Sequence, residues 1–145
     1  EIVIKRPFKA PRRLVWECHT KPELVRRWLV GPPGWEMPVC RIDLRVGGHY
    51  RYEWEDTSRG KTMGMDGTFT VVVPLTHLGS REKFDEDWTG GETDVSQAFA
   101  DENGQTMVTL TVRFSSKDAR DGATGLADGM AQGYARLDDL LSEMA

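Results

Sequence analysis

The stretch His49-Tyr50-Arg51-Tyr52-Glu53-Trp54-Glu55 carries an aromatic side chain at every second position. Successive side chains of a β-strand point to opposite faces, so this alternation predicts a strand with one apolar face and one solvated face. The same two-residue period continues over 39–46, 63–73, 78–84, 95–100 and 106–114, with turns at 47–48 and 101–104. Such strands, joined by short turns, are typical of an antiparallel sheet.

Helical signals lie on both sides of these strands. Residues 2–8 are rich in β-branched side chains and predict a first strand, followed by short helices at about 12–18 and 22–29. Thr20 is expected to cap the second short helix, and the Gly-Pro-Pro-Gly turn at 31–34 ends it. A long helix is predicted from about residue 118 to Met144, because apolar residues recur there at three- and four-residue spacing.

These elements predict an α+β fold. A curved antiparallel sheet of about six to seven strands is expected to wrap around the long C-terminal α-helix, with the two short helices closing one end. The chain has 145 residues, of which 39% are hydrophobic and 29% charged, and this composition suits a single globular domain over residues 1–145.

Charge and composition exclude several classes of function. The net charge of −4 argues against nucleic acid as the main partner, and no apolar run approaches the roughly 20 residues of a membrane span. The two cysteines and three histidines have no metal-ligand spacing, and no phosphate-binding glycine motif occurs, so neither a metal nor a cofactor is expected. Two cysteines are too few for a disulfide framework, which favours reduced thiols and a cytoplasmic location.

Aromatic and methionine side chains gather on the apolar faces of the predicted sheet and long helix. Buried Tyr and Trp side chains need a partner for their polar group, and Met suits a surface that must adapt to a ligand. Glycines at 125, 129 and 133 would leave a groove along the helix, where a ligand has room; a tightly packed core is the alternative interpretation. The predicted ligand-binding residues are Trp28, Trp35, Tyr50, Tyr52, Trp54, Met63, Met65, Phe69, Phe84, Leu126, Gly129, Met130 and Tyr134.

Glu82 is the candidate catalytic residue. It shares strand parity with Leu78 and Phe84, so its carboxylate is predicted to face the interior. A buried carboxyl group must be paired or its pKa rises, and a glutamate with a raised pKa can act as a general acid or base near neutral pH. A purely structural Glu82, satisfied by a backbone N–H or an arginine, is the alternative.

Several local motifs accompany this order of elements. They are Phe8-x-Ala10-Pro11, Arg27-Trp28, Gly31-Pro32-Pro33-Gly34, Asp43-Leu44-Arg45-x-Gly47-Gly48, Asp66-Gly67-x-Phe69 and Gly104-x-Thr106. Together they resemble the START-like or polyketide-cyclase (SRPBCC) superfamily, in the branch of the activator of heat-shock-protein-90 ATPase homologues. The resemblance implies a helix-grip fold with a deep apolar cavity between sheet and helix. It also implies a ligand, since relatives bind lipids, hormones or polyketides and a minority catalyse cyclisation or dehydration.

We therefore predict a protein that binds an apolar or aromatic small molecule in a cavity of about 300–1,000 Å³. Whether the chain is an enzyme stays open. One alternative is a small cyclase, dehydratase or hydrolase that uses Glu82 as acid or base, and a second is a protein-interaction or stress-related module. The acidic net charge disfavours close self-association, which predicts a monomer or a weak homodimer.

Overall fold

The computed structural model describes residues 1–30, 33–86, 91–116 and 126–144. Within these ranges strands and helices follow one another in the predicted order. In sequence they are β1 (Ile2–Phe8), α1 (Arg12–Thr20), α2 (Pro22–Trp28), β2 (Glu36–Ile42), β3 (His49–Asp56), β4 (Lys61–Val73), β5 (His77–Phe84), β6 (Thr93–Glu102), β7 (Gln105–Arg113) and α4 (Leu126–Met144).

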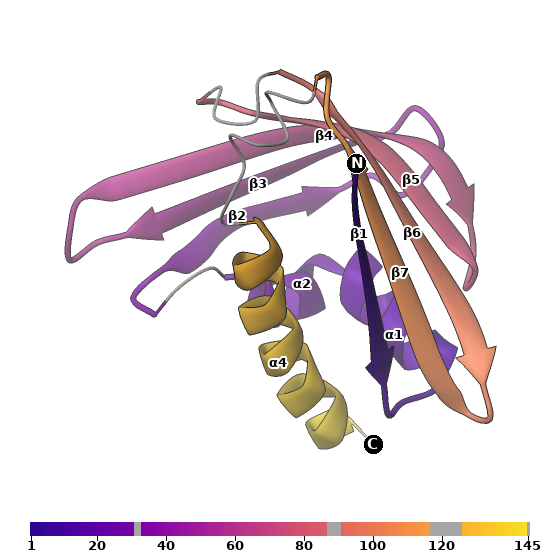
Figure 1. The fold of residues 1–145 in the computed structure, drawn as a ribbon. Coiled ribbons are helices and arrows are strands. Elements are labelled where there is room, and N and C mark those ends of the chain that lie inside the picture. Colours follow the sequence, from indigo (N-terminus) through magenta and orange to yellow (C-terminus); the bar gives the residue numbers. More distant parts are fainter. Residues whose placement is uncertain (31–32, 87–90, 117–125, 145) are drawn as a thin grey trace.

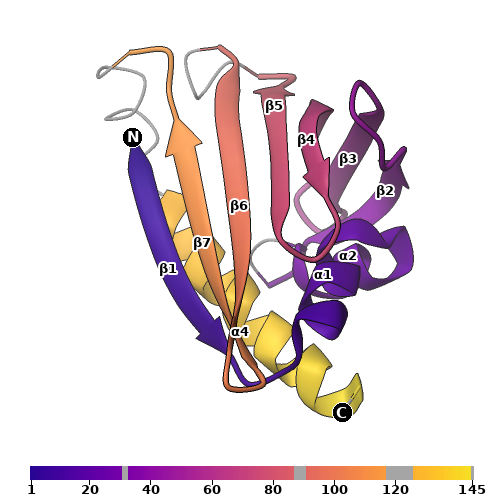
Figure 2. The same ribbon diagram turned by 90° about the vertical axis from the view of Figure 1, so that its right-hand side faces the viewer.

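The described strands form one seven-stranded antiparallel sheet, in the order β1-β7-β6-β5-β4-β3-β2 (Figure 2). β1 forms one edge by pairing with β7, so the first and last of these strands are neighbours in the sheet. The helices α1, α2 and α4 lie on one side of this curved sheet (Figure 1). This arrangement confirms the predicted α+β, helix-grip architecture.

Apolar side chains from the sheet and the helices meet in one core. Phe8, Val15, Val25 and Leu137 are almost completely buried there, and burial of each such side chain stabilises the fold by about 1.5–3 kcal/mol. In β3 the burial alternates as the sequence predicted, with the aromatic side chains on the inner face. This inner face, opposite the helices, is the surface on which a site is built.

The predicted strand at 39–46 is wrong in its second half. β2 ends at Ile42, which pairs with Tyr50, and the predicted two-residue turn is replaced by a longer connection. There Asp43 N–H donates to the His49 carbonyl and Gly47 N–H donates to the Phe69 carbonyl. The chain thus leaves the ladder early, and the side chains of Leu44 and Val46 are exposed.

A β-bulge changes the inner face of β4. The pairing of β4 with β5 shifts between Phe69 and Val71, so one extra residue reverses the orientation of the side chains after it. Phe69 remains buried, but Val71 and Val73 are exposed and Val72 packs against the core instead. The predicted inner face of this strand is therefore correct only as far as Phe69.

The predicted cap of the second short helix is also wrong. Thr20 is the last residue of α1, and its hydroxyl donates to the Trp16 carbonyl one turn earlier, a bond that competes with capping. Lys21 precedes α2, and Pro22 occupies the first turn as expected. Residues 31–32 of the predicted Gly-Pro turn and 118–125 of the predicted long helix lie outside the described residues.

Candidate functional site

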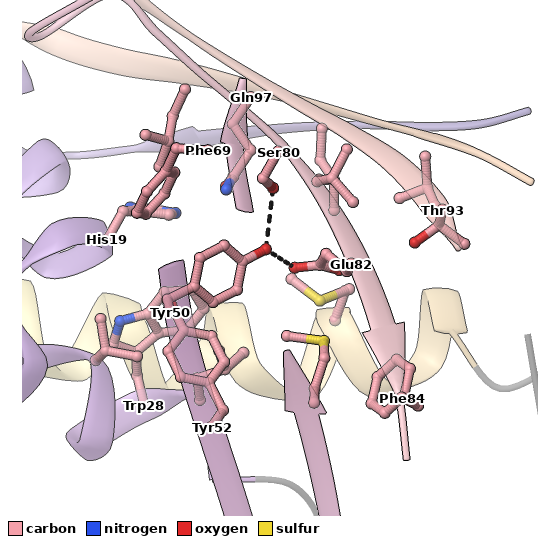
Figure 3. A pocket seen from close by; sticks show the side chains of 18 of the residues that line it. His19, Trp28, Tyr50, Tyr52, Phe69, Ser80, Glu82, Phe84, Thr93 and Gln97 are labelled. Carbon is pink, nitrogen blue, oxygen red and sulfur yellow. Dashed lines mark hydrogen bonds between the residues drawn. The ribbon is translucent and has the colours of Figure 1, made fainter. Parts of the chain in front are cut away.

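A cavity of about 180 Å³ lies on the inner face of the sheet (Figure 3). It is smaller than the predicted range, which corrects the expectation of a spacious pocket. Strand registers place four rows of side chains along its sheet side. The rows are Tyr52, Met65 and Phe84; Tyr50, Glu82 and Thr93; Phe69, Ser80, Val95 and Val112; and Leu78, Gln97 and Leu110.

The helices supply the opposite wall. His19 comes from α1, Val25 and Trp28 from α2, and Met130 from α4, while Leu29 follows α2 directly. Trp28 Nε1 donates to the Cys18 carbonyl at 2.8 Å, and this bond ties α2 to the end of α1. The indole donor is thus used by the backbone and is not available to a ligand.

Many of the predicted site residues line this cavity. They are Trp28, Tyr50, Tyr52, Trp54, Met65, Phe69, Glu82, Phe84 and Met130. For the strand residues among them the sequence signal was the two-residue alternation, which β3 keeps along its length. That they bind a ligand stays a prediction.

Other predicted site residues lie elsewhere. Met63 sits near the β3–β4 turn with 36% of its surface exposed, and Trp35 packs against the core without lining the cavity. Tyr134 is buried behind Trp28, its ring stacked at 6.0 Å from the indole and edge-on to Phe8 at 5.3 Å. The side chain of Leu126 lies outside the described residues.

The described part of the predicted groove along the long helix, which holds Gly129 and Gly133, does not line the cavity. Gly129 is exposed, and a Cβ atom added there would meet nothing within 4 Å. Gly133 is buried, and its added Cβ would lie 3.7 Å from Trp28. Of the three glycines predicted to form the groove, Gly129 faces open space and Gly133 allows ordinary packing. The third, Gly125, lies outside the described residues.

Tyr50, Ser80 and Glu82 form the hydrogen-bonded centre of the cavity (Figure 3). Tyr50 Oη lies 2.5 Å from Glu82 Oε2 and 3.0 Å from Ser80 Oγ. A phenol has one hydrogen, so it donates along the shorter contact to the carboxylate while the Ser80 hydroxyl donates to Tyr50 Oη. The prediction that Glu82 faces the interior and is paired is thus correct, and its partner is Tyr50 rather than a backbone N–H or an arginine.

Burial dominates the electrostatics of this centre. It raises the pKa of Glu82, although the hydrogen bond from Tyr50 acts in the opposite direction. It also raises the pKa of Tyr50, and the nearby Glu82 charge raises it further, so Tyr50 stays a protonated donor at neutral pH. The described lining residues include no lysine or arginine that would stabilise a charged Glu82.

His19 is a site residue that the sequence analysis missed. Its side chain lines the cavity and is 7% exposed. Burial lowers the pKa of His19 to about 4, so the imidazole is neutral at pH 7. His19 follows the inward-facing Val15 by four residues, so both side chains lie on the same face of α1. This spacing could have identified His19 from the sequence.

Two negative findings concern the described part of the chain. It holds no group of three or more His, Cys, Asp or Glu side chains that could bind a metal ion. None of its helices is long and apolar enough to cross a membrane.

Comparison with known proteins identifies relatives of this architecture. The family model described as "Activator of Hsp90 ATPase homolog 1-like protein" matches residues 9–142. A crystal structure of a protein from Rhodobacter sphaeroides is 28% identical with a TM-score of 0.90, covering 99% of this chain and 93% of that one. A protein from Nitrosomonas europaea is 23% identical with a TM-score of 0.86, covering 99% and 94%, and shows the same fold. A search of the curated proteins finds no match.

Proposed function

The chain belongs to the Activator of Hsp90 ATPase homolog 1-like family, and on that premise we propose that it binds a small apolar or aromatic molecule in the cavity between sheet and helices. The family has an SRPBCC-type fold and commonly binds hydrophobic ligands. The observation that carries the proposal is the cavity itself, whose wall is mostly aromatic and aliphatic.

The cavity volume limits the size of the ligand. An apolar cavity of about 150 Å³ is sufficient to bind benzene. The 180 Å³ found here therefore suits a single six-membered ring with a small substituent, rather than a sterol or a long acyl chain. The aromatic rings of Tyr50, Tyr52 and Phe69 provide faces and edges for such a ring.

Cavity filling tests this proposal. Val112 lines the cavity, so Val112→Phe should abolish binding of toluene in a calorimetric or NMR titration. The matched control is Val73→Phe, since Val73 is 48% exposed on β4 and does not line the cavity. Native mass spectrometry of the purified protein would then identify any ligand acquired in the cell. Equal toluene binding by both variants, or no binding by the unsubstituted protein, would contradict the proposal.

A second candidate function is general acid or base catalysis by Glu82. The observation that favours it is a partly buried carboxyl group, hydrogen-bonded to a phenol, on the wall of a ligand-sized cavity. The reaction class would be cyclisation, dehydration or hydrolysis. Ser80, a hydroxyl of the wall, bonds Tyr50 rather than a base, so covalent catalysis has less support. A ¹³C NMR titration of the Glu82 carboxyl tests this role: a pKa near 7 supports it, and an ordinary pKa opposes it.

A further inference from the structure

His19 carries an acceptor that no protein group satisfies among the described residues. Nδ1 lies 2.7 Å from the Val15 carbonyl oxygen, and because a carbonyl can only accept, Nδ1 carries the imidazole hydrogen. Nε2 is then left with a lone pair. It is buried, and it has no hydrogen-bond partner in the described part of the chain.

The two aromatic rings that pack against His19 hold the imidazole in place without offering it a donor. The rings of Trp28 and Phe99 pack against it, with centroids at 5.0 and 5.1 Å. The indole N–H of Trp28 is already bonded to the Cys18 carbonyl, and Phe99 has no donor. His19 lines the cavity (Figure 3), so a ligand bound there is the group that can bring a donor to the imidazole.

The rest of the wall limits the charge of the ligand. Glu82 is an acid, and the described lining residues contain no lysine or arginine. A carboxylate ligand would lose its hydration without gaining a counter-charge, and it would lie near another carboxyl group. A neutral ligand with a hydrogen-bond donor has no charge to desolvate and is not repelled by the Glu82 carboxyl group.

We propose that Nε2 of His19 accepts a hydrogen bond from the ligand, so that the cavity takes a neutral single-ring compound with a hydroxyl or N–H group and rejects carboxylates. The inference rests on the proposed function, because it requires a ligand in this cavity. It assigns His19 as the residue that distinguishes donor-bearing rings from purely hydrocarbon ones.

The first test uses the unsubstituted protein and three probes of similar size: phenol, toluene and benzoate. The imidazole ¹⁵N resonances of His19 report directly on hydrogen bonding at each nitrogen. We expect phenol to shift the Nε2 resonance at saturation, toluene to leave it nearly unchanged, and benzoate to bind at least about tenfold more weakly than phenol. Benzoate binding as tight as that of phenol would overturn the exclusion of carboxylates.

The second test compares variants. His19→Leu should lower the ratio of phenol affinity to toluene affinity by about tenfold. His49→Leu is the matched control, because His49 is an exposed histidine that bonds Thr68 and does not line the cavity. If His19→Leu does not fold, the ¹⁵N measurement on the unsubstituted protein decides.

The outcomes separate the two proposals. If both phenol and toluene bind and His19 Nε2 responds to neither, the inference about His19 fails while the proposed function stands. If neither ring binds, the proposed function fails and the inference fails with it. A phenol-specific Nε2 shift together with a phenol-specific loss in His19→Leu supports both.

Discussion

The phenol ring of Tyr50 lies directly over Gly67, where a Cβ atom would be only 1.9 Å from Tyr50 Cζ. Tyr50 on β3 is paired with Gly67 on β4, and Gly67 is paired with Glu82 on β5. The missing side chain at 67 lets the Tyr50 ring cross β4 and reach a carboxylate two strands away. The hydrogen-bonded centre of the cavity therefore depends on a glycine that carries no functional group.

Gly67→Ala should break this centre. The new methyl group would clash with a rigid ring, and overpacking of this kind lowers the free energy of unfolding by about 1–3 kcal/mol. Urea unfolding measures the loss, and the Tyr50 ring resonances should shift in NMR spectra.

A double-mutant cycle controls for other effects of the methyl group at 67. In a Tyr50→Ala background the same substitution should cost almost nothing, because the ring is gone. An equal cost in both backgrounds would show that the crossing of Tyr50 over Gly67 is not responsible.

Glu82→Gln should stabilise the protein at neutral pH but not in acid. Burial raises the folded-state pKa of Glu82 above its ordinary value of 4.5, so the folded protein favours the protonated carboxyl. This contribution to stability is complete below about pH 4.5 and is lost as the pH rises through the folded pKa. Glutamine mimics the protonated acid at every pH. The stability of Glu82→Gln relative to the unsubstituted protein should therefore increase as the pH rises from about 4.5 through the folded-state pKa.

Urea unfolding across that pH range measures this difference for Glu82→Gln. The control is Glu102→Gln, which removes the charge of an exposed glutamate at the end of β6. A constant difference between Glu82→Gln and the unsubstituted protein would mean that burial does not destabilise the charged carboxylate.

His19 should make the protein sensitive to acid. Its pKa is lowered to about 4 in the folded state by burial, from an ordinary 6.5. The folded protein therefore binds fewer protons than the unfolded chain, and stability present above pH 6.5 is lost as the pH falls towards 4. A pKa lowered from 6.5 to about 4 corresponds to a total loss of about 3 kcal/mol in the free energy of unfolding. His19→Leu should remove this loss, whereas His49→Leu should retain it; identical acid unfolding of all three proteins would contradict the burial of a neutral imidazole.

Gly129→Ala should stabilise the long helix without affecting the cavity. Gly129 is exposed in α4, and an added Cβ meets open space, so alanine should gain about 0.5–1 kcal/mol in helix propensity. Thermal unfolding measures the gain, and toluene affinity should be unchanged. Weaker toluene binding by Gly129→Ala would mean that the ligand contacts α4 at Gly129, as the sequence predicted.

Local periodicity was sufficient to predict the elements and their order. The alternation of Tyr50, Tyr52 and Trp54 reports a strand because the two-residue period is a property of the backbone itself. The inward orientation of Glu82 followed from the same parity, since β5 contains no bulge between Leu78 and Phe84 that would reverse it. The family resemblance added the helix-grip arrangement, which the structure confirms.

The cavity itself was decided by contacts between residues far apart in the chain. The bulge after Phe69 turned Val71 outward, and the register of three strands brought the Tyr50 ring over Gly67 to Glu82. Packing of α1 against α2 and β6 placed His19 between two aromatic rings on the cavity wall and left Nε2 without a hydrogen-bond partner among the described residues. No local pattern encodes these outcomes, because strand register and helix packing minimise the free energy of the whole core rather than that of any one segment.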